Sequence, residues 1–358
     1  VIGGTTLAKD LVLRAIANGK HVVTANKALL AVHGTEIFAA AHAREVMVFY
    51  EGAVAVSIPI IKALREGLAA NRIEWVAGII NGTTNFILSE MQGKGVGFAD
   101  ALAHAQGLGF AEADPTFDVE GMDAAHKLSL LASNAFGVPI PFDKVHVEGI
   151  SQLDSADLAF AESLGYCVKL LGIAKRCAGG LELRVHPTLV PADHLLAHVN
   201  GAMNAVMVKS DAAGITLYYG AGAGSEETAS AVIADLVDVC RTLGSAHRHR
   251  VPYLGFQPHA LVALPVTNIA DVVSSYYLRM QLADLASCLP KLRIYLRDAG
   301  VKVQQMEVFE LPGKIKKMSV VVITNPIQER VLCGVLAELD RSPTLVGRVT
   351  MIRMDALN

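Results

Sequence analysis

The fold is indicated first by residues 7–50, which read LAKDLVLRAIANGKHVVTANKALLAVHGTEIFAAAHAREVMVFY. Residues 7–18 have helical periodicity and stop at Gly19, a residue type common just after helices. A short apolar strand at 21–24, a second helix and another apolar strand at 46–50 follow. Helices that alternate with short apolar strands are typical of a parallel α/β sheet. We therefore expect these residues to form the last two or three units of a Rossmann-type parallel sheet.

The middle of the chain has a mixed pattern of helices and strands. The expected elements are helices at 58–67, 81–91, 98–107, 121–136 and 229–242, with a strand at 75–80. Residues 244–271 contain three prolines and predict a linker. This part is expected to be an α+β domain with a mixed sheet.

The last part of the chain has a pattern of its own. It predicts strands at 276–282, 301–309, 317–324 and 346–354, with helices at 285–299 and 328–339. The order βαββαβ in about 80 residues is typical of a ferredoxin-like sandwich. The fold class expected for the whole chain is therefore α/β, with a C-terminal ferredoxin-like unit.

Composition excludes several classes of protein. The 358 residues are 52% hydrophobic and 18% charged, with a net charge of −3, so the chain is expected to bury a large core. The near-neutral charge predicts no nucleic-acid partner, and no apolar run is long enough to predict a membrane span. The first residues look like the end of a strand rather than a signal peptide. Five scattered cysteines predict neither a disulfide framework nor a zinc site, which favours a cytoplasmic protein.

Residues 112–127 carry the densest set of charged groups, five carboxylates and one lysine. Asp123 and Lys127 are four residues apart and share one face of the expected helix, and Asp118 precedes it. A lysine held among carboxylates can donate or accept a proton at oxygen. Spacing alone nevertheless favours the ordinary alternative, a solvated Asp–Lys pair on a helix surface.

Three further motifs each leave two interpretations open. Thr24, Asn26 and Lys27 directly follow an apolar strand, either as a ligand-binding group at the end of a parallel strand or as a capped helix N-terminus. The glycine-rich turn at 220–224 precedes a helix and could approach a phosphate, but its spacing favours a simple tight turn. Residues 51–59 could offer backbone carbonyls to a cation, or simply connect a strand to a helix.

Taken together, several long blocks resemble homoserine dehydrogenase. They are residues 21–27 (HVVTANK), 78–88 (GIINGTTNFIL), 109–127, 186–189 (HPTL) and 220–232. The resemblance spans essentially the whole chain, and the last part looks like an ACT domain. It implies a remnant of the nucleotide-binding domain, a catalytic and dimerisation domain, a linker and an ACT-like regulatory domain. These cover, in turn, residues 1–55 with helix 225–243, residues 56–224, residues 244–274 and residues 275–358.

The resemblance implies interconversion of L-aspartate 4-semialdehyde and L-homoserine with NADP or NAD, in threonine, methionine and isoleucine biosynthesis. It makes Lys127 the proton donor at the reacting oxygen and Lys27 a second catalytic lysine. The implied substrate-binding residues are Glu112, Asp118, Asp123, Gly82 and Thr83, and the implied cofactor-binding residues are Lys27, Thr24, Asn26 and Gly222. A structural sodium ion is implied at Glu51, Val54, Val56 and Ile58. A homodimer or homotetramer and a threonine effector at the ACT-like domain are also implied.

This sequence departs from the family pattern in several places. The opening strand and its glycine fingerprint are absent, so an inactive amino-acid-binding and dimerisation platform is the alternative interpretation. Val56 stands where a small residue is usual, and Glu227 where proline is usual. The segment 284–289 (DLASCL) lacks the glycine expected at an effector-binding turn. A phosphorylating aspartate-semialdehyde dehydrogenase would need an activated cysteine, and no cysteine here has such a setting.

Overall fold

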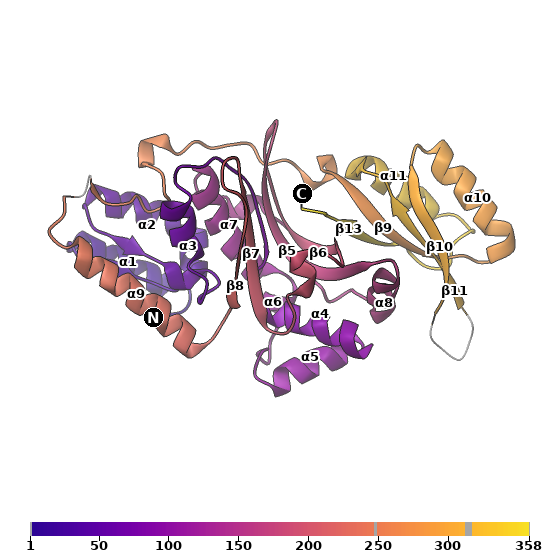
Figure 1. Cartoon of the computed structure of the whole chain (residues 1–358), viewed down its shortest axis with the longest axis horizontal. Helices are drawn as coiled ribbons and strands as arrows, with labels where there is room; N and C mark the ends of the chain where they lie inside the picture. The colour runs from indigo at the N-terminus through magenta and orange to yellow at the C-terminus, as the bar shows by residue number, and fades with distance from the viewer. Residues whose placement is uncertain (1, 247–248, 312–316, 358) are drawn as a thin grey trace.

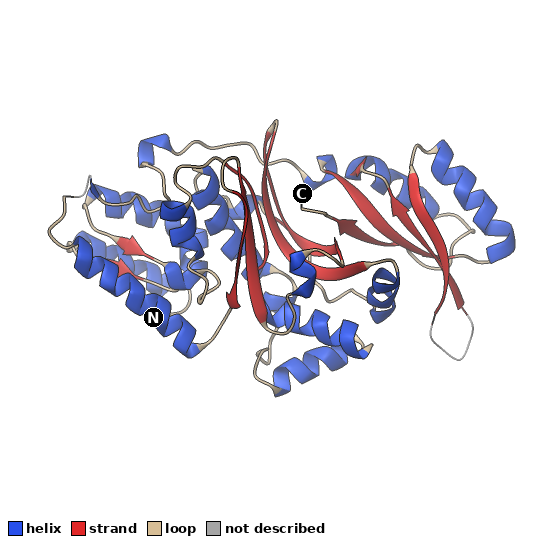
Figure 2. Ribbon diagram, in the orientation of Figure 1, coloured by secondary structure: helices blue, strands red, loops and turns tan. Residues whose placement is uncertain are grey.

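The computed structural model describes residues 2–246, 249–311 and 317–357. The N-terminal part lies at one end of the molecule and the C-terminal unit at the other, with long strands between them (Figure 1). Helices cover the strands in each part (Figure 2). None of the described helices is both long enough and apolar enough to cross a bilayer.

The N-terminal part has the alternation expected for a parallel sheet. Its elements are α1 (Thr6–Ala17), β1 (Val22–Val23), α2 (Lys27–Ala43) and β2 (Val48–Phe49). Strands β1 and β2 pair in parallel, with Val22 opposite Val48. Helix α9 (Ser225–Thr242) packs against β1 and against the short turn η1 (Glu51–Ala53), although it comes much later in the sequence.

The middle of the chain builds a mixed sheet with helices against it. Its helical elements are α3 (Ile60–Lys62), the π-turn η2 (Ala63–Gly67), α4 (Gly82–Lys94), α5 (Phe98–Gly107), α6 (Thr116–Val119), α7 (Met122–Phe136), η3 (Phe142–Lys144), α8 (Ser155–Ser163) and η4 (Leu195–His198). Its strands are β3 (Ile73–Ile79), β4 (His146–Val147), β5 (Tyr166–Cys177), β6 (Gly180–Pro191), β7 (Met203–Ser210) and β8 (Gly214–Ala221). The predicted helix at 58–67 is present as α3 continued by the π-helical η2, so it begins at Ile60, after Pro59, and ends at Gly67 as predicted.

The C-terminal unit has the predicted βαββαβ order, with one additional short strand. Its elements are β9 (Val273–Gln281), α10 (Leu285–Asp298), β10 (Val303–Leu311), β11 (Lys317–Thr324), β12 (Ile327–Gln328), α11 (Glu329–Leu339) and β13 (Thr350–Met354). Its main strands lie in the order β10-β11-β9-β13 and pair antiparallel, as in a ferredoxin-like sheet. The last strand begins at Thr350 rather than at residue 346.

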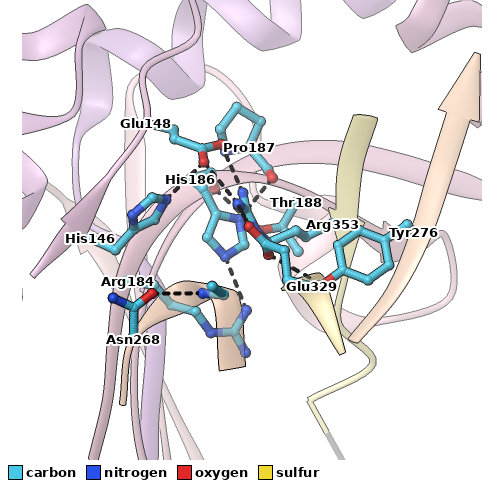
Figure 3. A network of polar contacts seen from close by, with 11 residues as sticks. His146, Glu148, Arg184, His186, Pro187, Thr188, Asn268, Tyr276, Glu329 and Arg353 are labelled. Atoms are coloured by element: carbon cyan, nitrogen blue, oxygen red, sulfur yellow. Dashed lines mark hydrogen bonds and ion pairs between the residues drawn. The ribbon is translucent and has the colours of Figure 1, made fainter. Parts of the chain in front are cut away.

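The C-terminal sheet continues into the central sheet. Strand β13 pairs in parallel with β6, with Arg353 opposite Thr188, and the order runs on through β5, β3, β7 and β8. Beside this junction Arg353 lies between Glu148 and Glu329, at 2.7 and 2.6 Å, and Tyr276 donates to Glu329 (Figure 3). The predicted linker at 244–271 also packs closely, since Tyr253 and Leu254 within it are buried. Residues 247–248 of that segment lie outside the described residues.

Helix α7 lies deepest in the molecule. Every residue from Asp123 to Phe136 is buried, because the helix packs against α2 on one side and against β3, β5 and β6 on the other. Polar side chains on such a helix need partners inside the protein. The partners of Asp123 and Lys127 define the site described next.

Candidate active site

Asp123 and Lys127 form a buried pair on one face of α7. Lys127 Nζ lies 2.7 Å from Asp123 Oδ2 and donates a second hydrogen bond of 2.8 Å to the carbonyl of Ile80. Asp123 is 3% exposed and Lys127 is 8% exposed. The interpretation of this spacing as a solvated surface pair is therefore wrong.

A second lysine reaches the same carboxylate from another element. Lys27, the first residue of α2, places Nζ 3.0 Å from Asp123 Oδ1. Its side chain is 32% exposed, so this ammonium is partly open to solvent while Lys127 is enclosed. Residues far apart in the sequence thus place one ammonium on each oxygen of Asp123.

Asn81 completes this cluster, and sequence reasoning missed it as a site residue. Its Nδ2 donates to Asp118 Oδ1 at 2.7 Å and to Asp123 Oδ2 at 2.8 Å. Its Oδ1 accepts from the backbone N–H of Thr84, which caps α4. The signal was present, because an N-cap asparagine uses only its oxygen for the cap and keeps two donors for other groups.

Asp118 and Thr83 lie on the outer side of Asn81. The Thr83 hydroxyl donates to the carbonyl of Phe110 at 2.7 Å and lies 3.3 Å from Asp118 Oδ2. Gly82 is enclosed by the chain beside β7, where an added Cβ would lie 2.6 Å from the carbonyl oxygen of Ala202. The structure therefore brings Gly82, Thr83, Asp118, Asp123, Lys27 and Lys127 together around Asn81.

The pKa values of the buried Asp123 and the partly buried Asp118 shift in opposite directions. Burial alone would raise the pKa of Asp123, but the ammonium groups of Lys127 and Lys27 outweigh it and hold that pKa well below its usual range. Burial and the neighbouring charge of Asp123 raise the pKa of Asp118. Asp123 therefore remains ionised between its two lysines, and the charge of Asp118 is disfavoured.

Glu112 lies outside this hydrogen-bonded group. It is an exposed residue, and the contact shown for it is its backbone carbonyl accepting from Gln106 Nε2 at 3.0 Å. Its predicted contact with the substrate stays a prediction.

The helix-cap interpretation of residues 24–27 is confirmed for Asn26, and the ligand-binding interpretation stays a prediction. Asn26 Oδ1 accepts from the N–H of Leu29 and caps α2, and Thr24 Oγ1 accepts from the N–H of Asn26. Lys27 instead extends to Asp123. Because this group follows β1 directly, it occupies the end of a parallel strand where nucleotides commonly bind.

Gly222 lies in the glycine-rich turn between β8 and α9. An added Cβ there would lie 2.1 Å from Asn204 Nδ2, so the turn passes directly over the Asn204 amide. Asn204 is fully buried, and neither polar atom of its side chain has a partner among the described residues. A residue larger than glycine at position 222 could therefore not fit in this turn without displacing Asn204.

The predicted ion-binding loop is a tight, buried connection. Glu51, Val54 and Ile58 are buried, and Ala55 has a positive φ of 52°. The two oxygens of the Glu51 carboxylate accept from the backbone N–H groups of Ile61 and Lys62, so they begin helix α3 rather than face the loop. The main-chain carbonyls of this loop, including that of Val56, are the candidate ligands that remain, and the ion site stays a prediction.

Comparison with known proteins gives consistent matches. A family model described as Homoserine dehydrogenase matches residues 59–237, and one described as Homoserine dehydrogenase, NAD binding domain, matches residues 1–51. The chain is 56% identical to the homoserine dehydrogenase of Pseudomonas aeruginosa, covering 100% of this chain and 82% of that protein. It is 50% identical to that of Neisseria gonorrhoeae, again covering 100% of this chain and 82% of the relative.

Solved structures agree with these matches. The crystal structure of a homoserine dehydrogenase from Thiobacillus denitrificans has a TM-score of 0.94 at 54% identity, covering 100% of this chain and 81% of that chain. A hyperthermophilic archaeal homoserine dehydrogenase in complex with NADPH has a TM-score of 0.58 at 29% identity, covering 66% of this chain and 69% of that chain.

Proposed function

This chain belongs to the homoserine dehydrogenase family, and from that premise we propose how its buried lysine pair serves the reaction. As a family member the chain is an oxidoreductase of amino-acid biosynthesis, which favours the enzyme over the platform interpretation. The proposed reaction interconverts L-aspartate 4-semialdehyde and L-homoserine. Its proposed proton donor is Lys127.

The observation that carries this proposal is the environment of Lys127 Nζ. An ammonium has three donors, and within the described chain Lys127 uses two, on Asp123 and on Ile80. One donor is left for a ligand oxygen. When a hydride adds to the aldehyde carbon, the carbonyl oxygen gains negative charge, and Lys127 would stabilise that charge and then give the oxygen a proton. In the reverse direction the neutral amine would take the hydroxyl proton.

Asp123 and Lys27 would keep Lys127 in place during this transfer. Because Lys27 lies on the second oxygen of Asp123, the carboxylate stays ionised and orients Lys127 without taking its proton. Glu112, Asp118, Thr83 and Gly82 would line the substrate, with the carboxylates facing the substrate ammonium. Glu112 is free to turn inward because it is exposed.

NADP or NAD, when bound, would supply or accept the hydride. The groups that fit this cofactor are Thr24, Asn26 and Lys27 at the end of β1, and Gly222 in the turn before α9. Lys27 Nζ is the partly exposed charge among them, suited to an anionic or polar group.

Initial rates and cofactor binding test the proposed function. The purified chain is mixed with L-homoserine and either NADP or NAD, and reduced nicotinamide is followed by absorbance. Binding of NADPH and NADH is measured in parallel by fluorescence. Turnover together with saturable binding is expected. Absence of both would contradict the enzyme and leave the amino-acid-binding platform.

We further propose a homodimer through strand β8, as the first step to any tetramer. This strand ends the sheet order, so its outer backbone edge has no pairing strand among the described residues of one chain. Its side chains Ile215, Leu217 and Tyr219 are 46%, 37% and 58% exposed. Apolar side chains on an open edge strand are typical of a surface that pairs with another chain. Light scattering should give twice the monomer mass, and a monomer at micromolar concentration would contradict it.

Three further proposals concern a bound ion, an effector and the cellular location. A sodium ion held by carbonyls of residues 51–58 should raise the melting temperature in sodium relative to choline salts. A threonine effector at the ACT-like unit should give heat when threonine is titrated into the protein. In that unit the Asp284 side chain is already in use, because it accepts from the backbone N–H of Ser287 and caps α10. A cytoplasmic location is supported by the five free cysteines.

A further inference from the structure

Asn204 is the second residue of β7, where the two turns that border the site come together. Strand β7 pairs with β3 on one side, and β3 leads to Asn81 and the first turn of α4. It pairs with β8 on the other side, with Asn204 opposite Gly220, and β8 continues into the glycine-rich turn. Asn204 therefore stands between the proposed substrate loop and the proposed cofactor turn.

The side-chain amide lies close to both turns. An added Cβ at Gly222 would lie 2.1 Å from Nδ2 and 2.3 Å from Oδ1 of Asn204, and one at Gly82 would lie 3.6 Å from Oδ1. The absence of side chains at both glycines allows the main chain to approach the amide this closely. The main chain at both glycines carries N–H and C=O groups of the kind that the amide could pair with.

This amide is unusual among the buried polar groups of the chain. Both Nδ2 and Oδ1 are buried without a hydrogen bond in the described part of the chain, although an amide offers two donors and an acceptor. By contrast, the buried Asn134 donates to the carbonyl of Leu130 and contacts the hydroxyl of Tyr50. Buried polar groups without partners destabilise a folded protein, and they concentrate at functional sites.

We propose that Asn204 is a positioning residue whose amide forms its hydrogen bonds only in the ligand-bound protein. On binding of cofactor, the Gly220–Gly224 turn shifts, and its backbone N–H and C=O groups pair with Oδ1 and Nδ2 of Asn204. These bonds hold the turn closed beside Asn81 and Lys127. The inference rests on the proposed function, because it requires a nicotinamide cofactor at this turn.

The test compares the free and the NADPH-bound protein in the variant Asn204→Leu. The replacement keeps the size of the side chain and removes the unpaired polar atoms, so the melting temperature without ligand should stay the same or rise. The affinity for NADPH, measured by fluorescence, should fall about 10- to 100-fold, as expected for the loss of one or two hydrogen bonds. The gain in melting temperature on adding NADPH should shrink accordingly.

Asn134→Leu is the matched control, since it removes a buried amide that is already bonded. It should lower the melting temperature without ligand and leave NADPH affinity nearly unchanged. If Asn204→Leu does not fold, Asn204→Ala replaces it as the test variant. The inference is overturned if Asn204→Leu behaves like the control, which would mean that the amide is bonded already in the free protein. If the parent itself does not bind NADPH, the proposed cofactor use fails, and this inference fails with it.

Discussion

At the scale of single residues, one carboxylate organises the site. Asp123 accepts from Lys127 on one oxygen and from Lys27 on the other, and Asn81 donates to the same group. Breaking a buried ion pair by removing one partner leaves a charge without compensation. Removal of the Asp123 charge therefore affects both lysines at once.

Asp123→Asn is expected to lower the free energy of unfolding by about 3–5 kcal/mol near neutral pH. The pKa of Asp123 is held low in the folded protein, so its stabilising charge is present above the ordinary pKa near 3.8 and is lost as pH falls toward the folded value. The difference between variant and parent should therefore shrink on acidification.

Urea unfolding of both proteins at neutral pH and near pH 3 measures this difference. Asp10→Asn, which changes an exposed aspartate on α1, is the control and should have little effect at either pH. A difference between Asp123→Asn and the parent that grows on acidification would contradict the ion-pair assignment.

The cluster could be foreseen in part from the sequence. Position in the sequence singled out Asp123, Lys127 and Asp118 around one helix and Lys27 after a strand, and the family resemblance added Thr83 and Gly82. Sequence alone did not show that the helix is buried, and this changes an ordinary surface pair into a site. Asn81 was not foreseen as a site residue, because its side-chain amide donates to residues 37 and 42 positions away.

At the scale of elements, local signals predicted helices better than they predicted strand partners. The helix at 98–107 was predicted with the bounds of α5, and α7 begins one residue after its predicted start. Helix α9 begins at Ser225 rather than at residue 229, since the glycine-rich turn ends just before it. Parallel pairing of β13 with β6 depends on contacts between distant segments, which no local pattern contains.

The close pairing of β3 with β7 predicts the effect of adding a side chain at Gly78. Gly78 lies opposite Val206 of β7, and an added Cβ would lie 2.4 Å from the carbonyl oxygen of Ala205. Gly78→Ala should force the strands apart and destabilise the protein by about 1–3 kcal/mol. Gly93 is the control, because it lies in α4 with no atom within 4 Å of an added Cβ.

Gly93→Ala should stabilise the protein by roughly 0.5–1 kcal/mol, since alanine restricts the unfolded chain. Thermal unfolding of Gly78→Ala, Gly93→Ala and the parent tests these two predictions. Equal effects of the two substitutions would contradict the described packing of β3 against β7.

At the scale of the whole molecule, the C-terminal unit is joined to the central sheet through buried polar groups. His186 on β6 is fully buried, and its Nε2 lies 3.0 Å from Arg184 Nη1 (Figure 3). Because a guanidinium only donates, Nε2 accepts, and Nδ1–H donates to the carbonyl of Pro187. His186 is therefore neutral. Burial, together with the charges of Arg184 and Arg353, lowers its pKa well below the usual value.

This neutral histidine makes the junction sensitive to acid. Below its ordinary pKa of 6.5 the unfolded chain binds a proton that the folded protein does not bind. The free energy of unfolding should therefore fall as pH drops below about 6.5, by up to roughly 1.4 kcal/mol per pH unit for this residue.

His186→Gln keeps an acceptor for Arg184. In this variant the free energy of unfolding should decline less steeply as pH falls. Denaturant unfolding at several pH values checks this slope. His259→Gln, a change of an exposed histidine, should leave the slope as it is in the parent. An unchanged slope in His186→Gln would show that the acid sensitivity arises elsewhere.

The steady-state turnover of Lys127→Ala, with and without added methylammonium, tests the role of the buried ammonium most directly. Turnover should fall about 10²- to 10⁴-fold, the usual contribution of a positioned acid–base group, and the small amine should restore part of it. Lys94→Ala, which removes an exposed lysine from α4, should keep full turnover. A folded Lys127→Ala protein with near-parental turnover and no response to amine would contradict the assignment.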